Sequence, residues 1–407
     1  MIISIAWRNI WRNRLRSLVI IIAITLGIFA GVLSTGFMKG MVDQRIESAI
    51  ENEVSHIQIH HPEYRQEDKL IQYIPQASEK VRELNEISTV RASSQRLSAN
   101  CMITSAGKGS GINLTGIKPN QEKQVTNIHE QLIKGSYFND VPKRVIPLVI
   151  GQKLADKLNA KIKSRIVIQF ADVNGNPVSM GCRVTGIYKT DNSAFDGMHA
   201  YVRYSDLQEI MGVPEKAGHE IAVLLHDNDA LEKAKSEIAG MYHNKEVNTW
   251  KELSPELSYL NDMMEQYMYI IVIIILLALL FGIVNTMLMA VLERIKELGM
   301  LMAIGMNRKR VFSMIMLEAI FLALTGGLTG IVIGYGITEL LGQTGVDLSI
   351  YATGLEAMGW STVIYPDIGL DTLAGVTGLV ILTGIVSAIY PALKALRLNP
   401  AESIRTE

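Results

Sequence analysis

Four long apolar stretches interrupt an otherwise mixed sequence. They cover residues 17–38, 266–292, 311–338 and 372–393. Each reaches the roughly 20 residues that a helix needs to cross a bilayer. A buried helix of a soluble protein rarely stays so free of charge over this length. The pattern therefore predicts four transmembrane helices.

Helical patterns also continue outside these spans. Residues 1–16 place Trp7, Ile10 and Trp11 at the i, i+3, i+4 spacing among arginines, which is typical of an amphipathic helix on a membrane surface. After the first span, an apolar stripe continues through residues 42–50, so that helix is expected to project as a stalk. A matching stalk is expected just before the second span.

Residues 39–265 alternate short strand-like and helix-like patterns. Strands are predicted at 56–60, 96–105, 112–117, 165–170, 183–188 and 220–225, and helices at 150–159, 205–211 and 229–242. The Asn174-Gly175 pair marks a hairpin turn. The length of this region suits two small α+β subdomains with helical stalks at its ends.

Positive charge is distributed unevenly around the spans. Arginines precede the first span, and residues 293–310 and 394–407 also carry lysines and arginines. Residues 339–371 contain five acids and no lysine or arginine. By the positive-inside rule, both termini and residues 293–310 lie in the cytoplasm. Residues 39–265 and the short loop 339–371 then lie outside.

Composition excludes several classes of function. A net charge of −1 gives no reason to expect nucleic acid as a partner. The sequence has no phosphate-binding loop, zinc-protease, paired-cysteine or serine-hydrolase motif, so no catalytic residue and no metal ligand is predicted. His56 and His60 share a face of a predicted strand but lie about 13 Å apart, too far for one metal ion. Cys101 and Cys182 are expected to be buried free thiols, although a disulfide is chemically permitted outside the cytoplasm.

The connector at residues 293–310 has the pattern of a short amphipathic helix. One helical face carries Ile295, Leu298 and either Leu301 or Met302. Gly305 suits the position after a helix C-terminus, and Asn307 suits the N-cap of the next helix. We expect a rigid helix facing the cytoplasm; the alternative is a surface helix that only links two spans.

Acidic and glycine residues within the spans have structural interpretations. Glu318 lies near the cytoplasmic end of the third span, where pairing with a basic connector residue is favoured over a proton or ion pathway. Gly27 and Gly31 are four residues apart, and the third span repeats glycine at 326, 330 and 334. Such spacing lets helices approach closely, and we expect it to pack the spans of one chain together.

Three motifs together resemble one known family. They are the start "AWRNIWRNRLRS", the segment "ERIKELGMLMAIGMNRKRVFSMIMLEAIFLALTGGLTGIVIG" and the end "SAIYPALKALRLNPAESIR". The chain resembles the FtsX-like permease family of ABC transporters, which includes macrolide exporter and lipoprotein-releasing permeases; it is most similar to the latter. In the second motif the matching residues are Arg294, Glu297, Gly299, Ala303, Gly305 and Glu318. Met302 departs from the family, in which a basic residue often precedes this alanine.

The resemblance implies a fold and a division of labour. The fold is a membrane protein with four transmembrane helices and a large extracytoplasmic α+β domain, a MacB-like periplasmic core domain, between helices 1 and 2. The chain would be a permease and not an enzyme, with no cofactor of its own. A cytoplasmic ABC ATPase dimer would bind ATP and Mg. It would push on a coupling helix whose residues are Arg294, Glu297, Leu298, Gly299, Ala303 and Gly305, and the stalks would carry the motion outward by mechanotransmission.

The function implied by this resemblance is release of lipoproteins from a bacterial inner membrane. The chain would work with a second permease copy or a homologue, contact membrane lipids and pass its lipoprotein substrate to a periplasmic carrier. The expected cavity residues are Ile28, Val32, Met263, Met264, Met268 and Ile271. A MacB-like efflux permease for drugs, peptides or toxins, and an FtsX-like signalling permease that regulates a cell-wall hydrolase, remain alternatives.

Overall fold

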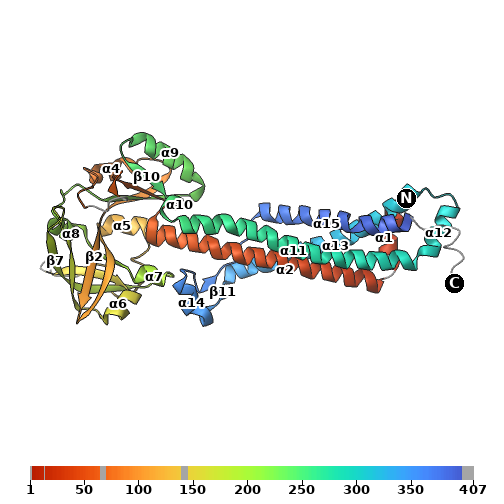
Figure 1. The fold of residues 1–407 in the computed structure, drawn as a ribbon, viewed down its shortest axis with the longest axis horizontal. Coiled ribbons are helices and arrows are strands. Elements are labelled where there is room, and N and C mark those ends of the chain that lie inside the picture. The colour runs from red at the N-terminus through yellow and green to blue at the C-terminus, as the bar shows by residue number, and fades with distance from the viewer. Residues whose placement is uncertain (1, 13, 65–69, 139–144, 397–407) are drawn as a thin grey trace. The chain divides into compact units, whose positions relative to one another are not determined.

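The computed structural model describes residues 2–12, 14–64, 70–138 and 145–396 (Figure 1). Its backbone forms two compact units. The helical unit contains Met1–Val42, Asp262–Asp347 and Val363–Glu407, and the α+β unit contains Asp43–Asn261 and Leu348–Thr362.

The helical unit is built mainly from long apolar helices. The elements are α1 (Ile2–Arg12), α2 (Arg14–Ala49, followed by the π-turn η1, Ile50–Val54), α11 (Pro255–Glu293), α12 (Ile295–Ala303), α13 (Arg308–Thr344) and α15 (Leu370–Leu396). Within the part of the chain that the structure describes, four helices are long and apolar enough to cross a membrane: Arg14–Val54, Pro255–Glu293, Arg308–Thr344 and Thr372–Leu396. This agrees with the predicted fold class. Both α2 and α11 continue beyond the predicted spans, as helical stalks require.

Glycines in α13 make the close contact with α2. A Cβ atom placed on Gly330 would lie 2.8 Å from the carbonyl oxygen of Thr25 and 2.9 Å from Cβ of Ile28. Gly334 meets Val32 in the same way. Only hydrogen fits at these positions, so the predicted role of these glycines in packing the spans of one chain is confirmed.

The α+β unit contains one ten-stranded sheet. Its strands are β1 (Ile57–His60), β2 (Val90–Ser105), β3 (Lys108–Ile117), β4 (Leu132–Gly135), β5 (Ile146–Gly151), β6 (Arg165–Ala171), β7 (Pro177–Tyr188), β8 (His199–Arg203), β9 (Glu220–Leu225) and β10 (Glu246–Thr249). The order is β10-β1-β9-β2-β3-β8-β5-β7-β4, and β6 pairs with both β2 and β7. Strands β2, β3, β8, β5, β7 and β6 therefore close on themselves as a small barrel, and β9, β1 and β10 extend the sheet from β2.

Short helices cover this sheet. They are α4 (Ala77–Leu84), α5 (Pro119–Val125), α6 (Gln152–Leu158), α7 (Ser193–Asp196), α8 (Tyr204–Met211), η2 (Asn228–Ala230), α9 (Leu231–Met241) and α10 (Trp250–Leu253). The barrel interior follows the alternation of its strands: Ile166, Ile168 and Phe170 of β6 are buried while their neighbours are exposed. Cys101 and Cys182 are buried there as free thiols, as predicted. Burial raises the pKa of each to about 12.

The predicted strands and helices are present, and the structure adds elements that were not predicted, among them β4, β8 and β10. The helix predicted from residue 150 begins at Gln152, because residues 146–151 form β5, a strand buried on both faces that periodicity did not reveal. The region 339–371 is more than a short loop. It contains the end of α13, β11 (Val346–Asp347), η3 (Ser349–Tyr351), α14 (Ala352–Ala357) and β12 (Val363–Ile364). The division of the external region into two subdomains stays a prediction.

Candidate functional site

The connector between α11 and α13 is a short helix held between two defined ends. Helix α12 begins at Ile295, and Gly305 after its C-terminus has φ +106°, a conformation that favours glycine. The side chain of Asn307 accepts a hydrogen bond from the backbone N–H of Lys309 at 3.1 Å and caps α13. These are the signals expected from the sequence, and they confirm a short helix in place of a plain loop.

Ion pairs tie this connector to α1 and α2. Nη2 of Arg12 lies 2.8 Å from both carboxylate oxygens of Glu297, and Nε of Arg294 lies 3.1 Å from the same carboxylate. The guanidinium of Arg16 pairs with Glu293. The hydrogen bond from Arg12 holds the pKa of Glu297 below its usual range, so this carboxylate stays ionised at neutral pH.

Glu318 is the buried end of the same network. Its carboxylate accepts a hydrogen bond from Nδ2 of Asn9 at 2.7 Å, and Nη1 of Arg294 lies 3.2 and 3.3 Å from its two oxygens. Glu318 is 7% exposed. The predicted pairing with a basic residue of the connector is therefore confirmed, and a charge that would be costly in an apolar bundle is satisfied.

A cavity of about 390 Å³ lies inside this network. Its lining residues come from α1, α2, α11, α12 and α13 and include Arg12, Arg16, Glu297 and Glu318. Because charges of both signs line it and are paired with each other, the cavity marks where five helices are joined through polar contacts. A displacement of α12 would have to move its partners on α1 and α13 as well.

The six predicted coupling residues fall into three groups. Arg294 and Glu297 belong to the ion-pair network, Leu298 and Gly299 are buried, and Ala303 and Gly305 are exposed. Their role in coupling stays a prediction.

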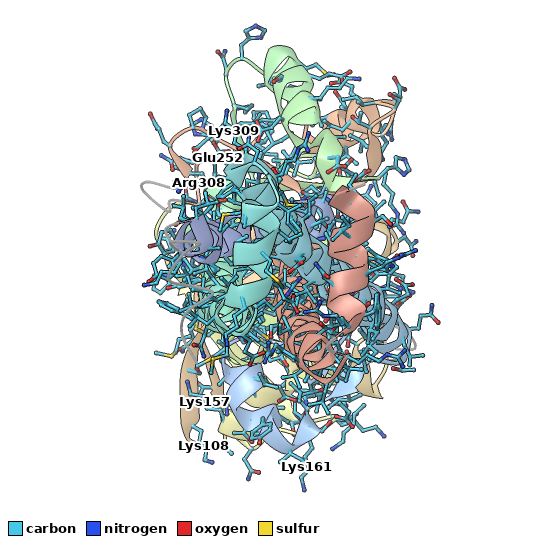
Figure 2. All side chains as sticks on the ribbon, turned by 90° about the vertical axis from the view of Figure 1, so that its right-hand side faces the viewer. Lys108, Lys157, Lys161, Glu252, Arg308 and Lys309 are labelled. Carbon is cyan, nitrogen blue, oxygen red and sulfur yellow. The ribbon has the colours of Figure 1, made fainter. Side chains whose placement is uncertain are left out.

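The outward surface of the connector includes two apolar side chains that sequence reasoning missed. Met300 is 51% exposed and Ile304 is 85% exposed. Arg308 and Lys309 follow at the start of α13, and their basic side chains extend from the surface (Figure 2). Ile304 ends the apolar run at residues 300–304 directly before Gly305, so the sequence alone gave no signal that its side chain is exposed.

The predicted cavity residues have two different environments. Ile28 and Val32 are buried against Gly330 and Gly334, so in this chain they serve helix packing. The other four are half-buried on α11: Met263, Met264, Met268 and Ile271. Assignment of a substrate cavity to this set stays a prediction.

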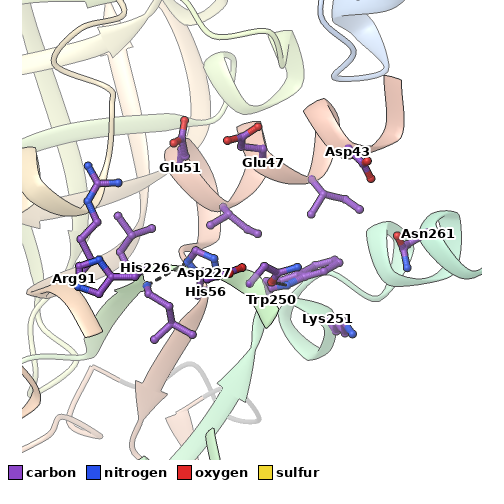
Figure 3. A pocket seen from close by; sticks show the side chains of 15 residues that line it. Asp43, Glu47, Glu51, His56, Arg91, His226, Asp227, Trp250, Lys251 and Asn261 are labelled. Atoms are coloured by element: carbon purple, nitrogen blue, oxygen red, sulfur yellow. Dashed lines mark hydrogen bonds between the residues drawn. The ribbon is translucent and has the colours of Figure 1, made fainter. Parts of the chain in front are cut away.

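The α+β unit has its own pocket, of about 440 Å³ (Figure 3). Asp43, Glu47 and Glu51, spaced four residues apart on the stalk, line it together with His56. Nδ1 of His56 accepts a hydrogen bond from the backbone N–H of Leu225 at 3.2 Å, and burial lowers the pKa of this ring to about 4. The imidazole is therefore neutral at physiological pH. Among the described residues, no three histidine, cysteine or acidic side chains are grouped to hold a metal ion.

Comparison with known families accounts for both units. The FtsX-like permease C-terminal model matches residues 269–400, and the MacB-like periplasmic core domain model matches residues 17–241, more than half of the chain. Four membrane-length helices with such a domain between the first two define the permease of an ABC transporter. The chain belongs to the FtsX-like, MacB-type family of ABC transporter permeases.

Individual relatives are distant. The chain is 28% identical over 207 residues to a macrolide export ATP-binding/permease protein MacB of Syntrophobacter fumaroxidans, a match that spans 51% of this chain and 26% of that protein. It is 24% identical over 313 residues to a lipoprotein-releasing system transmembrane protein LolC of Xylella fastidiosa, spanning 72% of this chain and 73% of that protein. The crystal structure of the periplasmic region of MacB from Actinobacillus actinomycetemcomitans is 13% identical, covers 53% of this chain and 98% of that structure, and has a TM-score of 0.35.

Proposed function

We propose that this permease extracts lipoproteins from the inner membrane by mechanotransmission and transfers them to a periplasmic carrier. A cytoplasmic ABC ATPase dimer binds ATP with Mg and supplies the energy. Both termini and the connector lie in the cytoplasm, and the α+β unit lies in the periplasm. A second permease copy, or a homologue, completes the transporter.

The extent of the LolC match carries this proposal. It spans similar shares of both proteins, 72% and 73%, and so covers most of each chain. The MacB match spans only 26% of its partner, whose name includes an ATP-binding function as well as a permease. Resemblance over most of a permease supports a shared task better than resemblance over one part of a larger protein.

The connector supports the mechanism. Its exposed surface combines the apolar side chains of Met300 and Ile304 with the cations Arg308 and Lys309. A protein partner can bury the apolar pair as an anchor surrounded by polar contacts. Its inward side is tied to Glu318 of α13 through Arg294. A push on the outer surface therefore reaches the membrane helices through salt bridges rather than through a flexible loop.

The first test concerns the motor. The tagged chain, purified from its host membranes, is expected to retain a nucleotide-hydrolysing subunit. Ile304→Glu should remove the apolar anchor and release that subunit, whereas Met241→Glu is a matched control at an exposed methionine of α9. If the nucleotide-hydrolysing subunit co-purifies equally with both variants, the connector is not its docking site.

The second test concerns the cargo. The intact transporter is placed in proteoliposomes with a native lipoprotein, and release into solution is measured with a soluble carrier present. Release that requires ATP supports the proposal, and ATP hydrolysis that releases no lipoprotein overturns it.

A MacB-like exporter is the second candidate, because the periplasmic core model and the MacB relative both match this chain. Stimulation of the ATPase by a macrolide or peptide, with none by lipoprotein, would select that function. The same preparation therefore separates the two proposals.

A further inference from the structure

The segment between α13 and α15 is shared by both units. Its middle, Leu348–Thr362, is compact with the α+β unit, while β11 and β12 at its ends belong to the helical unit. The backbone therefore passes from one unit to the other at residues 347–348 and 362–363, as well as along α2 and α11. This segment is a covalent link in addition to the two stalks.

Its ends are fixed in the helical unit. Val346 pairs with Ile364 and Asp347 with Val363. The returning strand is then bound to α2, because the backbone N–H of Asp367 donates to the carbonyl of Gly36 at 3.0 Å. Nζ of Lys39 also lies 3.0 Å from the Asp367 carboxylate. These contacts hold the end of α13 and the approach to α15 within the helical unit.

Its middle is fixed in the α+β unit by two contacts. Nζ of Lys189, directly after β7, lies 2.7 Å from a carboxylate oxygen of Glu356 on α14. Helix α14 lies beside α7 (Figure 1). Gly359 follows α14 with φ +77°, and a Cβ atom there would lie 2.7 Å from Nε of Arg45. The backbone N–H of Leu348 donates to the carbonyl of Thr362 at 2.7 Å and closes the segment.

Arg45 connects the second contact to the rest of the unit. Its Nη1 lies 2.9 Å from Glu53, and that carboxylate accepts a hydrogen bond from Nδ2 of Asn192 at 3.0 Å. The side chain of Asn192 caps α7. The segment thus contacts Lys189 at the end of the barrel strand β7 and Arg45 of the stalk, which reaches the N-cap of α7 through Glu53. The stalks themselves lead directly into β1 and out of β10.

We propose that Leu348–Thr362 is a clasp through which α13 and α15 act on the barrel. The inference rests on the proposed mechanotransmission and adds a route to it. The stalks move the β10-β1-β9 part of the sheet, and the clasp moves the β7 part. Movement of the helical unit would then reach the sheet at two separate places, the β10-β1-β9 part and the β7 part.

The Lys189–Glu356 pair suits a contact that holds but can be released. The two side chains are 42% and 20% exposed, so water weakens their attraction. Removing an ion pair of this kind should increase opening of the segment by about two- to five-fold. Lys189 and Glu356 are positioning residues, since they act through the barrel.

The structural part of the proposal can be tested on the intact protein by carbodiimide coupling. The reagent activates the Glu356 carboxylate, the Lys189 amine attacks it, and an amide forms as urea leaves. Mass spectrometry should detect that cross-link in the unmodified chain. The exposed Lys216–Glu79 pair, at 2.8 Å, serves as a positive control for the chemistry. If the Lys216–Glu79 cross-link forms and the Lys189–Glu356 cross-link does not, the clasp proposal is wrong.

Three variants then separate contact from function. Lys189→Arg keeps the ion pair but cannot form the amide, so it should lose the cross-link and retain transport. Lys189→Glu should lose the cross-link and lower substrate release per ATP by about two- to five-fold, with basal ATP hydrolysis unchanged. Adding Glu356→Lys to Lys189→Glu should restore both. In Gly359→Ala the added methyl group presses on Arg45, so this variant should also lower substrate release per ATP.

The outcomes distinguish this proposal from the proposed function. If the unmodified transporter releases nothing with ATP, the proposed function fails while the cross-link still tests the contact. If it releases substrate, and Lys189→Glu removes the cross-link but releases substrate equally well, the clasp proposal is wrong.

Discussion

Arg12 and Glu297, 285 positions apart in the chain, form a two-pronged ion pair in which one guanidinium nitrogen lies 2.8 Å from both carboxylate oxygens. Helix α1 therefore holds the connector. It also packs on α13, where Trp7 meets Phe321 edge to face at 5.7 Å. Trp7 and Trp11 are 42% and 45% exposed, and the binding of α1 to a membrane surface stays a prediction. The same helix braces the element on which the ATPase is proposed to push.

The Arg12–Glu297 pair gives the first prediction. Arg12→Glu should place like charges together and free α12 from α1, so ATP hydrolysis continues while substrate release falls a few-fold. Combining Arg12→Glu with Glu297→Arg restores opposite charges and should recover release. The measurement is release per ATP hydrolysed in proteoliposomes. Arg14→Glu is the control, because it makes the same charge change at an exposed residue at the start of α2. Equal losses in the Arg14 variant and the Arg12 variant would show that net charge matters and the pair does not.

Glu318 gives the second prediction. Its replacement by alanine takes the carboxylate away from Nη1 of Arg294 and Nδ2 of Asn9 in a largely buried site and should destabilise the protein by about 3–5 kcal/mol. Glu318→Gln keeps an acceptor for Asn9 and should cost less. Thermal unfolding in detergent is the measurement, with Glu339→Gln as an exposed control on the same helix. Full stability of Glu318→Ala would mean that the carboxylate is solvated after all.

Sequence patterns predicted the helical unit better than the α+β unit. Long apolar runs and the Gly305 and Asn307 signals depend on neighbouring residues alone, so the spans and the short connector helix followed from them. Pairing of Arg12 with Glu297 depends on where two distant helices pack, and no local pattern encodes that. Strand β5 was missed because a strand buried on both faces has no alternation.

The loop between α13 and α15 shows the same limit at a functional level. Its lack of positive charge predicted its side of the membrane but not its partner. Glu356 and Gly359 look like ordinary loop residues in the sequence. Only the tertiary contacts with Lys189 and Arg45 give them a role. The six predicted coupling residues divide likewise, since the sequence placed them on one helix but could not tell inward from outward contacts.

Packing between α2 and α13 gives the third prediction. Gly330→Ala puts a methyl group 2.8 Å from the carbonyl oxygen of Thr25, which must move away, and should cost about 1–3 kcal/mol. Gly336→Ala is a matched control on the same helix, where a Cβ atom meets nothing within 4 Å. Alanine also favours helix over glycine, so the control should be neutral or slightly stabilising. Unfolding temperatures in detergent compare the two, and similar values would refute the close approach.

Asp196 gives the last prediction, a pH dependence of the α+β unit. It is 2% exposed, and burial raises the pKa of its carboxyl to about 7 despite hydrogen bonds from the backbone N–H and the hydroxyl of Thr190. The folded protein therefore holds a proton there that the unfolded chain releases near pH 4. Its contribution to stability is complete below pH 4 and is lost as pH rises through about 7.

The expected loss is of the order of 1–4 kcal/mol between those limits. Asp156, Lys153, Lys189 and Glu356 line the same cavity as Asp196. Added salt should weaken only the part of the pH dependence that comes from the charges of these neighbours. Hydrogen exchange of residues 188–197 across pH 4 to 8 measures it, after correction for intrinsic exchange. Asp196→Asn carries no titrating proton and should flatten the profile, whereas Asp172→Asn, at an exposed turn, should leave it unchanged. An Asp196→Asn profile that still falls with rising pH would assign the titration to another group.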